Sequence, residues 1–378
     1  MPLTARAAVL DRLGSSTPYA DSRPLNIKQV VLDDPKAGEV RVAIKAAGLC
    51  HSDLSVINGD RPRPMPMALG HEAAGIVEAL GPDITDLEIG DHVVMVFMPS
   101  CGHCGPCAEG RPALCEPGAK ANTEGRLLSG RRAFICDDGE APLNHHLGCS
   151  AFASHAVVSR RSLIKIDKDL PFEHAALFGC AVLTGVGAVV NTAGLKAGQS
   201  AVIIGLGGVG LAAVLGALAS GASPVIAVDL NPDKLALAAS LGAVHTINGT
   251  DPDAVERVKA LTDGGADFAF EMAGSSRALE NAWKMTRRGG TTITAGLPPP
   301  DATLPVNIVS LVGEERTLKG SYIGTCVPSR DIPRYIRLFK DGRLPVDKLL
   351  SGTLALDQIN AAFDALADGM AVRQIIRF

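Results

Sequence analysis

The chain has no excess of positive charge. Lys and Arg together number 36, against 40 Asp and Glu, and the net charge is −4. Nucleic acid and anionic membranes are therefore not attracted over a broad surface. A zinc-ribbon module that binds nucleic acid is disfavoured too, because the sequence has no basic stripe. We expect a small molecule as the partner.

The first residues, MPLTARAAVL, lack the apolar segment of a secretory signal. The nine cysteines are odd in number and unevenly spaced, which argues against a disulfide framework. We therefore expect a cytoplasmic protein, in which clustered thiols are more often metal ligands or reactive groups than disulfides.

Charged side chains are missing from residues 200–228, a stretch long enough for a membrane span. Glycines near its start and Pro224 near its end instead favour a strand, a tight turn, a buried helix and a second strand. Strands covered by helices on both faces are expected to be continuously apolar.

Neither internal repeats nor low-complexity tracts are present, and 378 residues suffice for two packed domains. From about residue 200, apolar strands such as SAVIIG and PVIAVDL alternate with helical segments, which predicts an α/β fold with a doubly wound parallel sheet of six strands. The first 170 residues contain short β-rich segments between Gly and Pro turns. The last 50 residues do not clearly extend the alternation and could return to the first domain.

A dinucleotide site is predicted at Gly205, Gly207 and Gly210, which form G-x-G-x-x-G between an apolar strand and an apolar helix. The glycines permit a sharp turn, approach of the backbone to a pyrophosphate and tight packing of helix on strand. Alone, the motif could be a turn between core elements. Asp229 ends the next strand, where a carboxylate can accept the ribose hydroxyls and repel the extra phosphate of NADP, so NAD is expected.

Four cysteines follow the spacing C-x2-C-x2-C-x7-C in a loop rich in Gly and Pro. They are Cys101, Cys104, Cys107 and Cys115. Four thiolates suit a closed, structural zinc site. An iron–sulfur cluster is the competing interpretation, but the bacterial ferredoxin run has a shorter final gap followed by proline.

A second metal site has candidates in Cys50, His71 with its neighbour Glu72, and Cys180, although spacing alone does not join them. Cys180 could equally be a small core residue, and His71 a hydrogen-bonded turn histidine.

At these motifs the sequence resembles the medium-chain, zinc-containing alcohol dehydrogenase family. The resemblance rests on GLCHSD at 48–53, GHEAAG at 70–75, the four-cysteine loop, GCAVLTG at 179–185 and GLGGVG at 205–210, and it covers essentially the whole chain. It implies a β-rich, GroES-like catalytic domain at 1–181 and 323–378 and a Rossmann NAD-binding domain at 182–322.

The resemblance further implies that Cys50, His71 and Cys180 bind a catalytic zinc, whose fourth position is left for water or the substrate oxygen. Two zinc ions per subunit are thus expected, together with NAD. Among the catalytic residues it implies, Ser52 passes on the alcohol proton, Asp53 holds the ligand histidine, and Glu72 lies behind the zinc.

Two positions depart from the pattern of many relatives. Ser55 stands where the proton relay often ends in a histidine, so water or another hydroxyl must replace it. His51 stands where some relatives have an arginine against the pyrophosphate, so looser NADH binding is expected. The residues implied to bind the cofactor are His51, Gly205, Gly207, Gly208, Val209, Gly210, Asp229, Lys234, Leu297 and Arg373.

The segment between Cys115 and Cys180 is similar to the long lobe of dimeric members, which implies a homodimer. Its His145 and His146 could be metal ligands, but the two zinc sites are already complete, so these histidines are interpreted as packing within the lobe or lining the substrate cleft.

Phe97, Leu147 and Leu297 match positions that line the cleft in relatives, which implies an apolar pocket for primary or aromatic alcohols. The alternative is a thiol-dependent (glutathione or mycothiol) formaldehyde dehydrogenase, although Arg61 stands where those enzymes carry acidic residues. Cys180 argues against a polyol substrate, for which glutamate is the usual third ligand. A non-catalytic NAD-binding protein is the alternative of another class, disfavoured because every ligand is retained.

Overall fold

A computed structural model describes residues 3–136 and 142–378. Contacts divide the chain into unit 1, which comprises Met1–Cys180, Val327–Pro333 and Leu350–Phe378, and unit 2, which comprises Ala181–Cys326 and Arg334–Leu349. The boundaries expected from the sequence differ mainly in Arg334–Leu349. Within unit 2, the short helix η5 (Val346–Leu349) of this segment contacts helix α7 (Gly208–Ala219).

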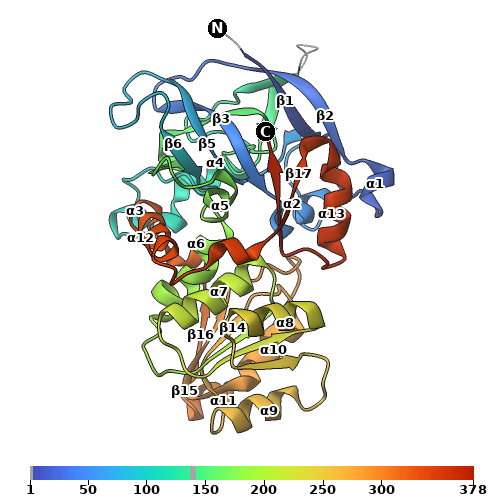
Figure 1. Ribbon diagram of the computed structural model, residues 1–378, viewed down its shortest axis with the longest axis vertical. Helices are drawn as coiled ribbons and strands as arrows, with labels where there is room; N and C mark the ends of the chain where they lie inside the picture. Colours follow the sequence, from blue (N-terminus) through green and yellow to red (C-terminus); the bar gives the residue numbers. More distant parts are fainter. Residues whose placement is uncertain (1–2, 137–141) are drawn as a thin grey trace. The chain divides into compact units, whose positions relative to one another are not determined.

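Unit 2 is built on one parallel sheet with the strand order β13-β12-β11-β14-β15-β16. Figure 1 labels β14, β15 and β16. Its strands are β11 (Ala201–Ile204), β12 (Val225–Asp229), β13 (His245–Asn248), β14 (Ala266–Glu271), β15 (Thr286–Thr294) and β16 (Thr317–Gly320). This is the order of a dinucleotide-binding Rossmann sheet, with the reversal between β11 and β14. The predicted doubly wound α/β fold with six strands is confirmed.

Local signals in the sequence explain why the helices of unit 2 begin and end where they do. Helix α8 (Pro232–Leu241) starts with proline after Asn231, whose side chain accepts from the backbone of Asp233, and it ends at Gly242 with φ of 115°. It packs on β12 and β13, and α10 (Ser276–Met285) packs on β14 and β15. The other helices are α6 (Ala181–Gly187), η3 (Ala188–Ala193), α9 (Ala254–Leu261), α11 (Ile308–Gly313) and η4 (Ile323–Thr325). Helix α12 (Pro328–Lys340) contributes residues to both units.

The uncharged stretch 200–228 folds as β11, α7 and the start of β12, as expected. Every residue of β11 is buried, which accounts for the absence of charge. Among residues 3–136 and 142–378, no helix combines the length and the apolar character needed to cross a membrane.

Unit 1 contains a closed barrel and a seven-stranded sheet. The barrel strands, in order, are β1 (Leu3–Leu10), β2 (Leu25–Leu32), β7 (Phe134–Cys136), β8 (Pro142–His145) and β4 (Met67–Ala68). The sheet strands, in order, are β10 (Leu163–Ile166), β6 (His92–Met95), β5 (Glu72–Leu80), β3 (Glu39–Gly48), β18 (Arg373–Arg377) and β17 (Leu350–Ala355), with β9 (His155–Ser159) also on β3. Because β18 pairs with β3, the chain does return to its first domain (Figure 1).

Short helices complete unit 1. They are α1 (Tyr19–Ser22), α2 (His51–Ile57), α3 (Gly105–Ala108), η1 (Pro112–Leu114), α4 (Glu116–Thr123), η2 (Arg160–Ser162), α5 (Phe172–Leu177), η6 (Leu356–Gln358) and α13 (Ile359–Ala367). The described cysteines form no disulfide, which agrees with the thiol chemistry expected for them.

Candidate active site

The start of helix α2 holds two of the predicted site residues in fixed positions. Cys50 is the N-cap and Asp53 the third helical residue, and the backbone N–H of Cys50 donates to Oδ2 of Asp53 at 3.2 Å. This reciprocal arrangement is a capping box, which satisfies N–H groups that the first helical turn leaves unpaired. Cys50 is thereby held at the N-terminus of the helix.

Three donors from distant parts of unit 1 meet beside this helix. The sulfurs of Cys50 and Cys180 and a ring nitrogen of His71 all lie within 4.8 Å of one another, and all three residues are buried. Nε2 of His71 is 3.4 Å from Sγ of Cys180. On its other side, Nδ1 of His71 contacts Oδ1 of Asp53 at 3.0 Å, so the ring is held between a carboxylate and the two sulfurs.

This donor set fits zinc. Tetrahedral zinc places sulfur and imidazole ligands roughly 3.5 to 3.8 Å apart, close to the spacing observed. A hydrogen bond from Cys180, together with the charges of Arg373 and His71, holds the pKa of Cys50 well below its usual range. Burial opposes protonation of His71, but the Asp53 carboxylate outweighs it and raises the pKa of His71. With three protein ligands, a tetrahedral ion keeps one open position, as in catalytic sites.

Glu72 is a fully buried carboxylate next in the chain to His71. Burial raises its pKa to about 7, against the opposing charge of Arg373. Nη1 of Arg373 lies 3.5 Å from Oε2 of Glu72 and donates to the carbonyl of Leu49 at 2.9 Å. The guanidinium of Arg373 is thus engaged within unit 1, and its expected phosphate contact stays a prediction.

Two rings from outside the donor set pack edge-on against His71. The centroid of Phe97 lies 5.3 Å away, and that of His146 lies 5.5 Å away. His146 also brings Nδ1 to 3.2 Å from Oδ1 of Asp53. The sequence suggested packing in the lobe or the cleft for this histidine, and no pattern in it pointed to the carboxylate.

The four cysteines of the loop also converge. The sulfurs of Cys101, Cys104, Cys107 and Cys115 lie within 4.8 Å of one another. Backbone N–H groups donate to these sulfurs. The N–H of Cys101 donates to Sγ of Cys115 at 3.1 Å, and the N–H of Cys104 donates to Sγ of Cys101 at 3.3 Å. Burial disfavours the Cys101 thiolate, but such donors outweigh it and lower its pKa to about 6. The set fits a closed, tetrahedral zinc.

In unit 2, the glycine motif forms the turn between β11 and α7. Gly205 has φ of 89°, and a Cβ there would lie 2.7 Å from Cβ of Ala273. A Cβ on Gly210 would overlap the carbonyl oxygen of Gly205, so both positions require glycine. Gly207 is the N-cap of α7 and has open space where a side chain would begin. Open space beside free N–H groups at a helix start fits a pyrophosphate.

Asp229 ends β12 next to this turn. Its carboxylate accepts from the backbone N–H of Leu206 at 2.5 Å and of Asn231 at 2.9 Å. It therefore also shapes the glycine loop, a role the sequence did not suggest. Of the other residues expected to bind the cofactor, Gly208 and Val209 open α7, Lys234 lies in α8, Leu297 is 53% exposed in unit 2, and His51 starts α2 in unit 1.

Comparison with known proteins agrees with this geometry. The alcohol dehydrogenase GroES-like domain matches residues 36–168, and the zinc-binding dehydrogenase domain matches residues 208–341. An S-(hydroxymethyl)glutathione dehydrogenase of Paracoccus denitrificans is 36% identical over 365 residues, which cover 94% of this chain and 97% of the relative.

The chain belongs to the zinc-containing alcohol dehydrogenase family. Two solved structures share its fold over essentially full length. An alcohol dehydrogenase zinc-binding domain protein from Burkholderia ambifaria is 36% identical, with a TM-score of 0.94 and complete coverage of both chains. Benzyl alcohol dehydrogenase from Acinetobacter calcoaceticus is 34% identical, with a TM-score of 0.92 and coverage of 100% of this chain and 99% of its own. The family and the oxidoreductase class expected from the motifs are confirmed.

One buried carboxylate of this dehydrogenase escaped the sequence analysis. Glu271 ends β14, and its Oε1 accepts from the N–H groups of Ala273 and Gly274 at 2.8 and 2.6 Å, while Oε2 accepts from Thr294 Oγ1 at 2.7 Å. It ties the carboxyl ends of β14 and β15 together. The one available signal was a charge at the end of an otherwise apolar strand.

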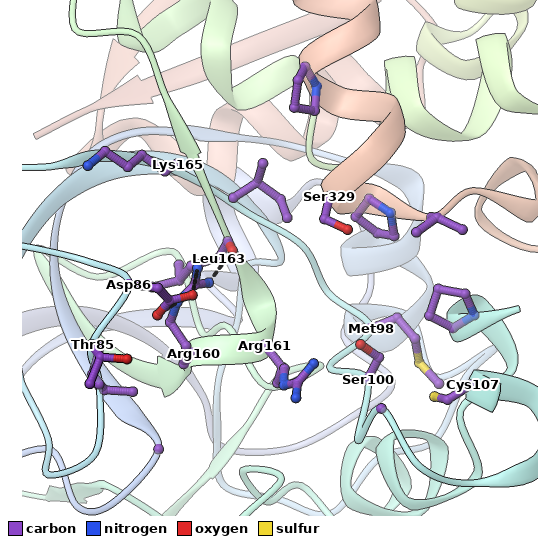
Figure 2. A pocket seen from close by; sticks show the side chains of 18 of the residues that line it. Thr85, Asp86, Met98, Ser100, Cys107, Arg160, Arg161, Leu163, Lys165 and Ser329 are labelled. Atoms are coloured by element: carbon purple, nitrogen blue, oxygen red, sulfur yellow. Dashed lines mark hydrogen bonds and ion pairs between the residues drawn. The ribbon is translucent and has the colours of Figure 1, made fainter. Parts of the chain in front are cut away.

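A pocket of about 840 Å³ lies elsewhere in unit 1 of this dehydrogenase (Figure 2). Arg160, Arg161 and Lys165 line it, and none of the three clustered donors does. Arg160 is paired with Asp86 at 2.7 Å and Lys165 with Asp91 at 2.8 Å, so the positive charge of the wall is largely neutralised. The reacting groups are therefore expected at the buried cluster and not in this pocket.

Proposed function

We propose that this alcohol dehydrogenase uses NAD to interconvert a primary or aromatic alcohol and its aldehyde at the cluster of Cys50, His71 and Cys180. The observation that carries the proposal is the convergence of these three donors, with Asp53 holding the far side of the imidazole. Two thiolates and one imidazole are a ligand set of catalytic zinc in alcohol dehydrogenases, and a structural site has four protein ligands instead.

The roles of the residues follow from their positions. Zinc held by this set would polarise the oxygen of the substrate, and a nicotinamide ring would accept the hydride from the alcohol carbon. Asp53 accepts the Nδ1 proton of His71, which leaves Nε2, directed at the sulfurs, as the nitrogen that would bind zinc. Ser52, in the first turn of α2, would take the proton of the substrate hydroxyl.

The onward path of that proton differs from a histidine relay. The hydroxyl of Ser55 donates to the carbonyl of His51 at 2.8 Å, so this side chain is committed to its own helix. We infer that the proton leaves Ser52 through water. Ser55→His, which supplies an imidazole at that position, should then raise the rate of alcohol oxidation below pH 8, and an unchanged rate profile would count against the path.

The choice of cofactor rests on unit 2. The glycine turn and the start of α7 would bind the pyrophosphate, and the carboxylate of Asp229 would accept the ribose hydroxyls. A phosphate on that ribose would meet the negative charge of Asp229, so NAD is proposed over NADP.

The choice of substrate rests on the apolar side chain beside His71 and on a second buried apolar residue that follows His146 in the chain. Phe97 and Leu147 are buried, and the ring of Phe97 packs on His71. Such a wall suits an aryl or alkyl group, and the Acinetobacter relative is a benzyl alcohol dehydrogenase by name. The second candidate is S-(hydroxymethyl)glutathione, after which the Paracoccus relative is named.

One set of measurements tests both candidates. Metal analysis should find two zinc ions per chain, and Cys180→Ser should abolish turnover while NADH binding remains measurable. Reduction of NAD should then be compared for benzyl alcohol, an aliphatic series and formaldehyde with glutathione. Turnover with the thiol adduct alone would replace the proposed substrate, and full activity of Cys180→Ser would overturn the proposed site.

We also propose that the chain forms a homodimer through unit 2. β16 is an edge strand of the six-stranded sheet, and edge strands present unpaired N–H and C=O groups. Just before it in the chain, α11 exposes Ile308, Val309 and Val312 by 74%, 80% and 71%. A second copy of this chain would cover both features. Sedimentation should report a dimer that Val309→Asp converts to monomer, and a wild-type monomer would refute the assembly.

A further inference from the structure

Two imidazole rings lie at the same oxygen of Asp53. Its Oδ1 faces Nδ1 of His71 at 3.0 Å and Nδ1 of His146 at 3.2 Å, and its Oδ2 accepts from the backbone of Cys50. The residue is completely buried. A buried carboxylate is stable only when its lone pairs are matched by donors. Nδ1 of His146 is buried, makes no hydrogen bond to the described residues in this geometry, and has Oδ1 of Asp53 within hydrogen-bond distance, so its proton is available to the carboxylate.

His146 is itself built into the site. It is 1% exposed, and its ring stands at 90° to that of His71. Burial lowers the pKa of His146, against the opposing effect of Asp53. A neutral imidazole carries a single proton, and only on Nδ1 can that proton serve Asp53.

The backbone after His146 is held in a conformation that side chains rarely adopt. Leu147 and Ser150 have φ of 51°, and Gly148 has φ of 67°. The N–H groups of Cys149 and Ser150 donate to the carbonyl of His146 at 3.0 and 3.1 Å, and the N–H of His146 donates to the hydroxyl of Ser150 at 3.0 Å. Two non-glycine residues thus lie in the left-handed region within one turn, and this turn directly follows the backbone that carries the His146 side chain.

We propose that His146 is a positioning residue for the metal site: its Nδ1–H shares Oδ1 of Asp53 with His71 and holds the carboxylate that orients this ligand. The inference rests on the proposed zinc site of Cys50, His71 and Cys180. Outer partners of a ligand histidine fix its tautomer and ring orientation, and their loss weakens metal binding. His146 extends that support by one more residue.

Two variants distinguish a hydrogen-bonding role of His146 from a role in packing alone. His146→Phe keeps a ring and removes the N–H, and His146→Asn returns an N–H near the position of Nδ1. The matched control is His145→Gln, because His145 is the neighbouring buried imidazole and its Nε2 accepts from Ala133 N at 3.0 Å, with no contact to Asp53. The four-cysteine zinc serves as a reference within the same molecule.

The measurement is the rate at which a chelator removes zinc from the protein. The kinetic phase of zinc release that is missing in Cys180→Ser is assigned to the catalytic site. His146→Phe should lose this zinc about tenfold faster, while His146→Asn and His145→Gln stay close to wild type. The visible spectrum of cobalt at the same site should shift in His146→Phe and return in His146→Asn. Release of the four-cysteine zinc should be the same in all variants.

The outcomes that overturn the proposal are distinct. Wild-type release and an unshifted cobalt spectrum in His146→Phe would overturn the role of His146 alone, as would equal acceleration in His146→Phe and His146→Asn. One zinc per wild-type chain would overturn the proposed function as well. Three zinc ions, with one lost in His146→Phe, would show that Asp53, His71 and His146 hold a metal instead of sharing a carboxylate.

Discussion

His145 is an imidazole that the fold keeps neutral. It is fully buried, and its Nε2 accepts from the backbone N–H of Ala133 at 3.0 Å. Burial lowers its pKa to about 3, with the charges of Glu39, Arg131 and Arg132 acting more weakly. The unfolded chain binds a proton at this position near pH 6.5, whereas the folded chain does not.

The sign of the effect follows from this difference. Between pH 6.5 and about 3, the unfolded state binds more protons at His145, so the free energy of unfolding decreases as the pH falls. A folded pKa of about 3 gives a loss of about 2 kcal/mol between pH 7 and pH 5 from this one group. His145→Gln retains an acceptor for the N–H of Ala133 and cannot titrate, so it should lack this loss.

Urea unfolding at several pH values measures the effect as a difference between the two proteins. Zinc release at low pH affects both, so it cancels. Far-ultraviolet circular dichroism follows the whole chain, and the single tryptophan, Trp283, reports unit 2 separately. A stability difference between wild type and His145→Gln that stays constant from pH 7 to pH 5 would refute the assignment of His145 as a buried neutral base.

Three further outcomes are expected. Asp229→Gly removes the charge at the ribose and should raise the ratio of NADP to NAD efficiency by about tenfold or more; an unchanged ratio in steady-state kinetics contradicts the ribose role. Cys104→Ala should lower the midpoint of thermal unfolding more than it lowers turnover at low temperature, and the reverse pattern would place the loop in the active site. Arg131→Met leaves the buried carboxylate of Glu39 without its 2.6 Å partner and should lower the free energy of unfolding in urea by about 3 to 5 kcal/mol. Arg160→Met removes the partner of the exposed Asp86 and should lower it by less than about 1 kcal/mol. An equal decrease in the free energy of unfolding for both variants would show that burial of the carboxylate does not determine the effect.

Much of unit 2 could be predicted because its signals are local. Continuous apolar strands, the glycine turn before α7 and the Asn231 cap of α8 each act within a few residues. β16 was the exception, since all four residues of TLKG are exposed and carry no alternation. Its place in the sheet depends on pairing with β15, which no local pattern encodes.

Unit 1 was harder to predict for the same reason. Its barrel joins β2 to β7 across some hundred residues, and its strands are as short as two residues. The proposed ligands were assigned only through the resemblance to a family, because spacing alone does not join Cys50 to Cys180. The contact between His146 and Asp53 escaped even the resemblance, since it depends on how a tight turn directs one ring.

The pairing of β18 with β3 has a consequence for biosynthesis. The sheet beside the proposed metal ligands takes one strand from residues 39–48 and its neighbour from residues 373–377. A ribosome that has already produced the whole of unit 2 has therefore not yet delivered the strand that completes unit 1. We expect the Rossmann half to fold first on the nascent chain, and the sheet beside the proposed metal site to become complete only after residues 373–377 have emerged.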